Sequence, residues 1–284
     1  MCGPPAVRSS TGRYGIQILI LSEAMSAMRR QIVRFLFLLM VSAVANANSQ
    51  KASPTIIDLT DTIRVGMVED SIGDAAMKAF GIDEVSMSPE MTFQKTTGRS
   101  TRICLSSQIG THMDAGAHAD PDGWPVNEAP LDHLIVPGVV VNVRAKSDEE
   151  GITPADLEKY DIRPGDAVLF LFTYAKPKPG AMFSQSFVTE EAAEWLVKHG
   201  VRCVGSNTPG LEDHKRGARE HWMDPANQKQ AWPVHKILLR RHIPIIEGLT
   251  NLDKLVGKKF QFIGLPLKIE GIDGAPVRAL AVLD

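Results

Sequence analysis

The sequence has no surplus of positive charge. Its 31 Lys and Arg residues stand against 33 Asp and Glu residues, which gives a formal net charge of -2 at pH 7. A chain with this balance has no cationic excess to neutralise phosphates, so we expect no nucleic acid partner. Glycine (23 residues) and proline (18 residues) are not in excess among the 284 residues, which excludes a collagen-like or disordered chain.

Cysteine is scarce. The three cysteines include no CxxC pair and are too few for a disulfide scaffold. Cys104 and Cys203 each lie in an apolar segment, where a buried free thiol is the commoner state. A disulfide between them is the less favoured alternative, which an oxidising compartment would permit.

The N-terminal region has no hydrophobic run long enough to cross a membrane. Its apolar stretch, residues 35–45, has 11 residues, whereas a spanning helix needs about 20. The stretch follows Arg29 and Arg30 and ends near Ala45-Asn46-Ala47, small residues at the spacing that signal peptidase accepts. These three features are typical of a secretory signal peptide, an interpretation that we favour over a membrane anchor.

We therefore expect three parts in the chain. Translation would begin at Met28 or Met25, so that residues 1–27 precede the true start. Residues 28–47 would be the signal peptide, and residues 48–284 would form a single folded domain. The mature protein would be periplasmic or secreted and would have no membrane partner after cleavage.

Strands and helices alternate along the mature part. Runs rich in apolar and β-branched residues predict strands, at residues 56–59, 102–105, 137–143, 167–172, 201–205, 243–247, 260–266 and 277–283. Helical patterns and helix-terminating residues predict helices, at residues 74–80, 153–158, 189–199 and 234–241. This alternation, without repeats or an obvious linker, favours a single α/β domain.

The densest group of ionisable residues lies between Gln108 and His118. His112 and Asp114 are two residues apart, so on an extended segment their side chains leave the same face. A turn at Gly116 would let His118 swing back toward them. Two imidazoles and a carboxylate in one short segment suit a divalent metal ion. A chance cluster of hydrogen-bonded or exposed histidines is the alternative, and spacing alone leaves both open.

A second pair of candidate residues lies far downstream. His235 sits on a predicted helix, and Glu247 ends a predicted hydrophobic strand. A carboxylate in that position needs a cation, a metal or a helix end as its partner. On spacing alone, a salt bridge to Arg240, Arg241 or Lys236 is favoured.

Taken together, these segments resemble a known family. The run GTHMDAGAH at residues 110–118 is similar to the HxGTHxDxPxH signature of the metal-dependent cyclase/hydrolase family, which includes bacterial kynurenine formamidase and isatin hydrolase. His235 and residues 245–252 match the family's downstream His and Glu. Residues 58–60 resemble its opening DLS, and two segments within residues 262–279 resemble its closing part. The resemblance implies an α/β fold with a mixed, barrel-like sheet of the swivelling β/β/α cyclase type.

The resemblance also implies roles for individual residues. It implies a divalent ion, Zn or Mn, with ligands from both ends of the chain, namely His112, Asp114, His235, Glu247 and, in the first position, Gln108. His118 would be the general acid/base that moves a proton between water and the leaving nitrogen or oxygen. The implied activity is hydrolysis of an amide, lactam or lactone in a small-molecule substrate. Family members are usually dimers or tetramers, so we expect a homo-oligomer.

The sequence departs from the family pattern at several positions. Gln108 replaces the first histidine, and because an amide oxygen is a weaker ligand, a single ion, such as Mn, becomes plausible. Gly116 replaces a proline, which should loosen the turn that carries His118. Kynurenine formamidases carry a tryptophan soon after the opening DLS, where it holds the aryl substrate. This sequence has no tryptophan between residues 58 and 80, which argues against formylkynurenine as the substrate. A non-catalytic member that binds only a metal or ligand is the alternative that Gln108 and Gly116 suggest.

Three further features concern the surroundings of the site. Trp124 is a candidate for contact with substrate, with a packed loop aromatic as the equal alternative. Residues 213–224 are a polar stretch, for which a solvated loop is favoured over a lid. Ser206 does not lie in a G-x-S-x-G motif, so serine hydrolase chemistry is unsupported.

Overall fold

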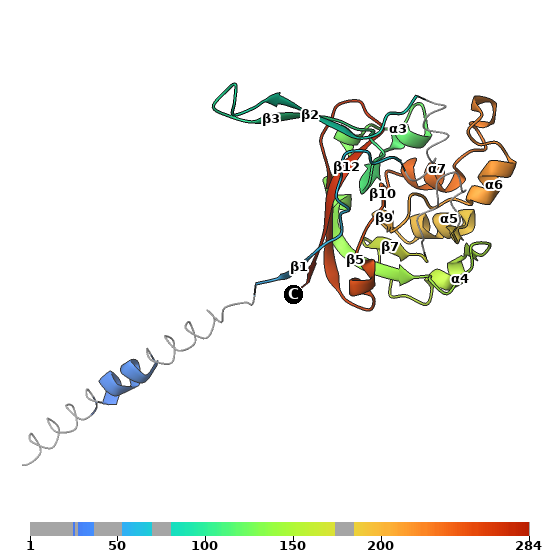
Figure 1. Ribbon diagram of the computed structural model, residues 1–284. Coiled ribbons are helices and arrows are strands. Elements are labelled where there is room, and N and C mark those ends of the chain that lie inside the picture. The colour runs from blue at the N-terminus through green and yellow to red at the C-terminus, as the bar shows by residue number, and fades with distance from the viewer. Residues whose placement is uncertain (1–24, 26–27, 37–52, 70–80, 174–184, 284) are drawn as a thin grey trace, which may run out of the picture. The chain divides into compact units, whose positions relative to one another are not determined.

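The computed structural model describes residues 25, 28–36, 53–69, 81–173 and 185–283 (Figure 1). The chain divides into two units, residues 1–53 and residues 54–284. In the first unit, residues 28–36 are helical and exposed. Among the described residues, no helix is both long and apolar enough to cross a membrane. The signal peptide therefore stays a prediction, and the helix predicted at residues 74–80 lies outside the described residues.

The second unit is built on one mixed sheet whose spatial order is β1-β12-β11-β5-β7-β9-β10-β4. Because β12 also pairs with β4, the seven strands from β12 to β4 close on themselves into a barrel, and β1 lies outside it. The strands are β1 (Thr55–Asp58), β4 (His112–Asp114), β5 (Ile135–Asn142), β7 (Ala167–Leu171), β9 (Cys203–Ser206), β10 (Ile245–Glu247), β11 (Phe260–Pro266) and β12 (Gly274–Leu283). The expected α/β fold with a mixed, barrel-like sheet is confirmed.

The strand β12 joins the two ends of the barrel. Its first residues, Gly274–Pro276, pair with β4, and residues 277–282 pair with β11. Residues 280–283 also pair with β1 along the other edge. Four neighbouring strands, β5, β7, β9 and β10, run parallel to one another. The C-terminal strand is thus what brings a distant segment of the chain against β4.

Helices cover one side of the sheet (Figure 1). They are α3 (Gly116–Ala119), α4 (Pro154–Leu157), α5 (Glu190–Lys198), α6 (His214–Arg219) and α7 (Pro233–Leu239), with 3-10 turns η1 (Val126–Glu128), η2 (Leu131–His133), η3 (Pro225–Asn227) and η4 (Leu252–Leu255). The helix predicted at residues 189–199 corresponds to α5, and the Thr189 side chain caps its start by accepting from the Ala192 N–H. Gly200, with φ of +71°, follows its end.

Two small sheets complete the fold. One pairs β6 (Gly151–Ile152) with β8 (Phe187–Val188). The other is an antiparallel hairpin of β2 (Ser86–Met91) and β3 (Ser100–Cys104), which extends away from the barrel (Figure 1). Every residue of β2 is exposed. This hairpin joins the barrel through residues 105–111, immediately before β4.

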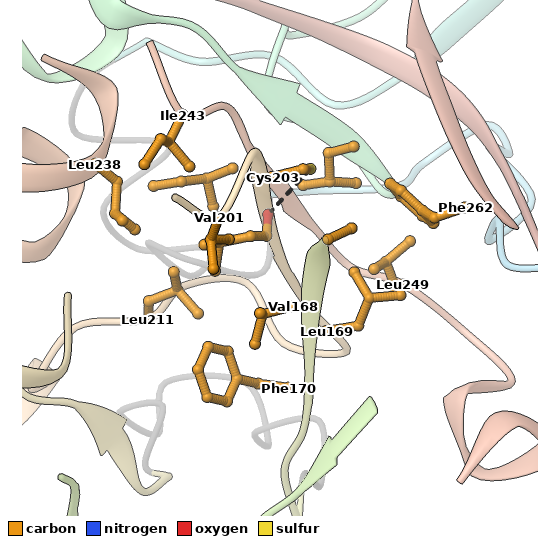
Figure 2. Close-up of a cluster of buried hydrophobic side chains, with 14 of the residues drawn as sticks. Val168, Leu169, Phe170, Val201, Cys203, Leu211, Leu238, Ile243, Leu249 and Phe262 are labelled. Atoms are coloured by element: carbon orange, nitrogen blue, oxygen red, sulfur yellow. Dashed lines mark hydrogen bonds between the residues drawn. The ribbon is translucent and has the colours of Figure 1, made fainter. Parts of the chain in front are cut away.

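The core lies between the parallel strands and the helices. Figure 2 shows Val168 and Phe170 of β7 on the side of the strand that faces Leu238 of α7, and Leu169 on the other side with Leu249 and Phe262. The residues predicted as apolar strands are thus buried on both faces, as expected for parallel strands covered by helices. This packing fixes the positions of β10 and α7, which carry Glu247 and His235.

Cys104 and Cys203 are both free thiols, as the sequence favours. Cys203 is fully buried, and desolvation raises the pKa of its thiol. The expectation that Cys104 is also buried is wrong, because it lies on the exposed hairpin strand β3.

Candidate metal centre

The strands β4 and β10 place three of the predicted ligands side by side. In their antiparallel register Glu247 is opposite His112, and Ile245 is opposite Asp114. Since side chains alternate along a strand, His112 and Asp114 share one face, whereas Met113 between them points into the core and is fully buried. The face that the two-residue spacing predicts therefore exists, and Glu247 lies on it.

The helix α7 supplies the fourth predicted ligand. It begins at Pro233, directly after Trp232, which has a left-handed backbone with φ of +57°. The helix packs against α3, α5 and β10, and it buries Val234, His235 and Leu238. This packing turns the His235 imidazole toward the carboxylates of β4 and β10. A non-glycine residue in this conformation costs about 1–3 kcal/mol, so the packing of Trp232 against its neighbours must offset that strain.

Pairs of ligand atoms in the centre lie at distances that suit coordination of an ion. His112 Nε2 lies 3.5 Å from Asp114 Oδ1 and 3.7 Å from Glu247 Oε2. His235 Nε2 lies 3.6 Å from Asp114 Oδ2 and 3.3 Å from Glu247 Oε1. Two ligand atoms on a tetrahedral ion, each about 2.0–2.2 Å from it, are separated by about 3.3–3.6 Å. The spacing is thus too long for strong hydrogen bonds but right for shared coordination.

The carboxylate oxygens lack the partners that burial demands. Asp114 Oδ1 and Oδ2 and Glu247 Oε1 are buried and accept no hydrogen bond from any described residue. Burying ionised oxygens without partners is costly, and a cation removes that cost. Oxygen and imidazole nitrogen are suitable donors for a divalent transition metal ion. The residues present therefore fit a divalent cation.

The salt bridge that spacing alone favoured for Glu247 is not formed. Among the described residues, Arg240 instead pairs with Asp120, with Arg240 Nε 2.7 Å from Asp120 Oδ2. The Lys236 ammonium donates to the Gln228 carbonyl. Glu247 ends its strand on the face that His112 and Asp114 share, opposite His112 in the sheet and 3.3 Å from His235 of α7.

Hydrogen bonds at the far side of each imidazole fix its orientation. The Gly110 carbonyl can only accept, so His112 Nδ1, 2.9 Å away, must donate to it. His235 Nδ1 lies 2.9 Å from Glu212 Oε1, which also accepts from the His235 backbone N–H. In both rings Nε2 is then left to face the carboxylates, as in metal-binding histidines with an outer hydrogen bond. Sequence analysis missed Glu212, which is 1% exposed.

The carboxylates of the centre favour protonated imidazoles, so a bound cation must displace protons from His112 and His235. Burial opposes protonation of His112, but the carboxylates of Asp114 and Glu247 outweigh it and raise the pKa of the imidazole to about 9. Burial likewise opposes protonation of His235, yet Asp114, Glu212 and Glu247 raise its pKa well above the usual value. Without a cation, protons on the two rings balance the carboxylates. Metal binding must release those protons.

His118 lies beside this group, as the resemblance implies. It is on α3, its ring centre is 5.9 Å from that of His235, and its side chain is 33% exposed. Ligand atoms of Asp114, His118 and His235 all lie within 4.8 Å of one another, and so do those of His112, Asp114 and Glu247, so Asp114 belongs to both groups. The structure thus brings five of the predicted site residues together: His112, Asp114, His118, His235 and Glu247.

The turn that carries His118 is packed rather than open. A Cβ on Gly116 would lie 2.5 Å from Trp124 Cδ1, so only glycine allows the indole to approach this closely. The Trp124 indole is buried and donates from Nε1 to the Leu239 carbonyl at 2.8 Å, which connects α3 to α7. The expected loosening at Gly116 is therefore offset by this contact. Trp124 occupies the position of a packing residue, and its contact with substrate stays a prediction.

Gln108 lies at the edge of the centre. Its Nε2 donates to Asp273 Oδ2 at 2.9 Å, so its amide is engaged with a residue that the sequence analysis assigned no role. Its use as a metal ligand stays a prediction.

A cavity of about 250 Å³ borders His118. Trp222, Met223, Trp232 and Lys236 also line it. The two indoles are 5.8 Å apart between ring centres, and Trp232 is edge-on to His235 at 6.0 Å. Part of the stretch 213–224, which was interpreted as a solvated loop, therefore forms a wall of this cavity.

Comparison with known proteins identifies the family. Residues 57–213, which include the run from Gly110 to His118, match the model of the Cyclase family, described as "Putative cyclase". The chain belongs to the Cyclase family. The family resemblance stated from the sequence is therefore confirmed.

Several solved structures share the fold of this chain. A "potential metal-dependent hydrolase with cyclase activity" is 25% identical, with a TM-score of 0.59, and the match covers 82% of this chain and 99% of the other. A predicted metal-dependent hydrolase from Bacillus stearothermophilus is 27% identical, with a TM-score of 0.58 and coverage of 81% and 99%. Isatin hydrolase A from Labrenzia aggregata shares the fold at 23% identity, with a TM-score of 0.62 and coverage of 87% and 98%.

Proposed function

We propose that this Cyclase family protein is a metal-dependent hydrolase that opens the carbonyl group of an amide, lactam or lactone. The observation that carries the proposal is the meeting of His112, Asp114, His235 and Glu247, with buried carboxylate oxygens that have no other partner among the described residues. The similarity to a potential and a predicted metal-dependent hydrolase, at 25% and 27% identity, supports the same conclusion.

Each residue of the site has a task in this reaction. The four ligands would hold a divalent ion, which when bound lowers the pKa of a water molecule and polarises a carbonyl group. His118, at the edge of the cavity, would accept a proton from water and return it to the leaving nitrogen or oxygen. The indoles of Trp222 and Trp232 give the cavity apolar walls beside His118, where a small substrate would be excluded from bulk water.

The identity of the ion and the setting of the enzyme are further parts of the proposal. Two imidazoles and two carboxylates suit Zn or Mn. The signal-like segment at residues 28–47 supports export to the periplasm or beyond, and family membership supports a homo-oligomer. Isatin, formylkynurenine and simple lactones are the first substrates to assay, with formylkynurenine the least favoured because the region between residues 58 and 80 has no tryptophan.

Metal analysis combined with hydrolysis assays tests the proposal. We expect the purified protein to bind Zn or Mn and to hydrolyse a member of the panel. His118→Gln should lower kcat by roughly 10²–10⁴-fold while the metal content is unchanged. Asp114→Asn should lose the ion. His199→Gln, a change at an exposed histidine stacked on Trp195, is the matched control and should alter neither quantity.

The outcomes separate the candidates. Full activity in His118→Gln would refute the role of that residue in proton transfer. A protein that binds the ion but hydrolyses no member of the panel would favour the non-catalytic alternative, and failure to bind Zn or Mn would refute the metal centre.

A further inference from the structure

Asp273 lies where the C-terminal strand meets β4. It directly precedes β12, and its backbone carbonyl accepts from the Ala115 N–H at 2.8 Å. The next residue, Gly274, is paired with Asp114 in the sheet. The position of the Asp273 backbone relative to the metal centre is therefore fixed by main-chain hydrogen bonds.

Three side chains from one stretch of the chain engage the Asp273 carboxylate. Ser107 Oγ donates to Oδ1 at 2.9 Å, and Gln108 Nε2 donates to Oδ2 at 2.9 Å. His118 Nδ1 lies 3.3 Å from Oδ2. Both carboxylate oxygens are thus held from one side by Ser107 and Gln108, and Oδ2 is left directed at the imidazole of His118.

The backbone leaves room for this arrangement. A Cβ on Gly274 would lie 2.7 Å from Gln108 Nε2 and 2.7 Å from the Met113 carbonyl oxygen. A larger residue would therefore push the Gln108 amide away from Asp273. Burial opposes ionisation of Asp273, but hydrogen bonds from His118 and Ser107 outweigh it and lower the pKa of the carboxyl group. The group facing His118 is consequently an acceptor only.

We propose that Asp273 is a positioning residue that orients His118 by accepting the proton of Nδ1, so that Nε2 is the nitrogen left to exchange a proton with substrate and water. Gln108 and Ser107 act through Asp273 by holding its carboxylate in place. This inference rests on the proposed function, in which His118 transfers the proton. It gives Gln108 a task that does not require it to bind the metal ion.

The tautomer of the His118 ring tests this assignment without any substrate. In the Zn-loaded protein, at a pH above the titration of the ring, 15N NMR of the imidazole should show Nδ1 protonated, and the His118 signals are identified by their loss in His118→Gln. Asp273→Ala should populate the Nε2-protonated form as well. Asp273→Asn keeps the shape but has a single acceptor oxygen, so it should give an intermediate result and provides a second variant should Asp273→Ala fold poorly.

Asp132→Asn is the matched control. The Asp132 carboxylate is exposed and pairs with Arg202, so this change should leave the His118 signals as in the wild type. An Nε2-protonated ring in the wild type, or an unchanged tautomer in both Asp273 variants, would overturn the proposal. A loss of bound Zn in Asp273→Asn would also overturn it, because Asp273 would then be a ligand.

Kinetics provide the second readout. For a substrate that the wild type hydrolyses, Asp273→Ala should lower kcat by about 10–100-fold with KM changed by less than about twofold, since the cavity walls and the ion are untouched. A change confined to KM would contradict the positioning role. Absence of hydrolysis by the wild type would refute the proposed function while the tautomer measurement still decides the role of Asp273.

Discussion

Binding of a divalent ion to the metal centre should release protons, and the affinity should therefore rise steeply with pH. In the absence of a cation the pKa of His112 is about 9 and that of His235 is also well above its usual value. His112 is then mainly protonated at pH 6–8, and the raised pKa of His235 favours the protonated form of that ring as well, so each ring must lose its proton before Nε2 can bind the ion. Each proton released changes the association constant by about tenfold per pH unit.

The expected magnitude is thus about a hundredfold gain in affinity for Zn per pH unit between pH 6 and 8, with close to two protons released per ion. Asp114 adds nothing in this range, because the neighbouring imidazoles, against the effect of burial, hold its pKa well below the usual value. Calorimetry in two buffers that differ in ionisation enthalpy measures the protons released, and competition with a chelator measures the affinity.

His199→Gln is the control and should give the same two protons, because this ring is stacked on Trp195 away from the centre. Release of fewer than one proton, or an affinity that is flat across the range, would show that the histidines are already neutral in the metal-free protein. The reasoning from the buried carboxylates would then be wrong.

Three other substitutions test the support of the site. Glu212→Gln weakens the acceptor that orients His235 and should reduce Zn affinity by about 10–100-fold, as measured by chelator competition. Gly123→Ala would place a Cβ 2.1 Å from the backbone carbon of Gly116; it should destabilise the protein by about 1–3 kcal/mol or more in urea unfolding, whereas Gly98→Ala, which has open space around it, should be neutral. Phe170→Ala removes a fully buried ring and should cost about 3–5 kcal/mol, and a loss below 1 kcal/mol would contradict the packing described for β7.

The parallel part of the barrel is readily predicted from sequence, because each strand is a continuous apolar run. Residues 137–143, 167–172 and 201–205 correspond to β5, β7 and β9 with ends shifted by one or two residues. The strand predicted at 243–247 begins only at Ile245, because His242 adopts a left-handed turn with φ of +56°. Apolar runs mark the middle of a strand well, but its ends depend on turn geometry.

Strands that depend on tertiary pairing were harder to predict. The segment Ser86–Met91 contains a proline and lacks alternation, and no strand is predicted there from the sequence, yet it pairs with β3. The start of β12 was placed at Val277, because Gly274-Ala275-Pro276 has low strand propensity; pairing with β4 extends the strand to Gly274.

In the site, too, local sequence predicts some features, whereas others depend on tertiary packing. The shared face of His112 and Asp114 follows from their spacing, but the approach of His235 and Glu247 depended on family resemblance, since spacing alone favoured a surface salt bridge. Glu212 lies in no periodic pattern or motif. Its role as hydrogen-bond partner of His235 can be recognised only from the packing of α7 beside it. Asp273 lay in a segment matched to the family without a role, because its contacts with Ser107 and His118 exist only after the barrel closes.

The pairing of the C-terminal strand β12 with both β4 and β11 also has a consequence for biosynthesis. The second strand partner of β4 is residues 274–276 of β12, so it exists only after the ribosome has translated past residue 276. The barrel that holds His112 and Asp114 therefore closes late in synthesis. Loss of the final strand would leave the histidines and carboxylates without a closed barrel to hold them.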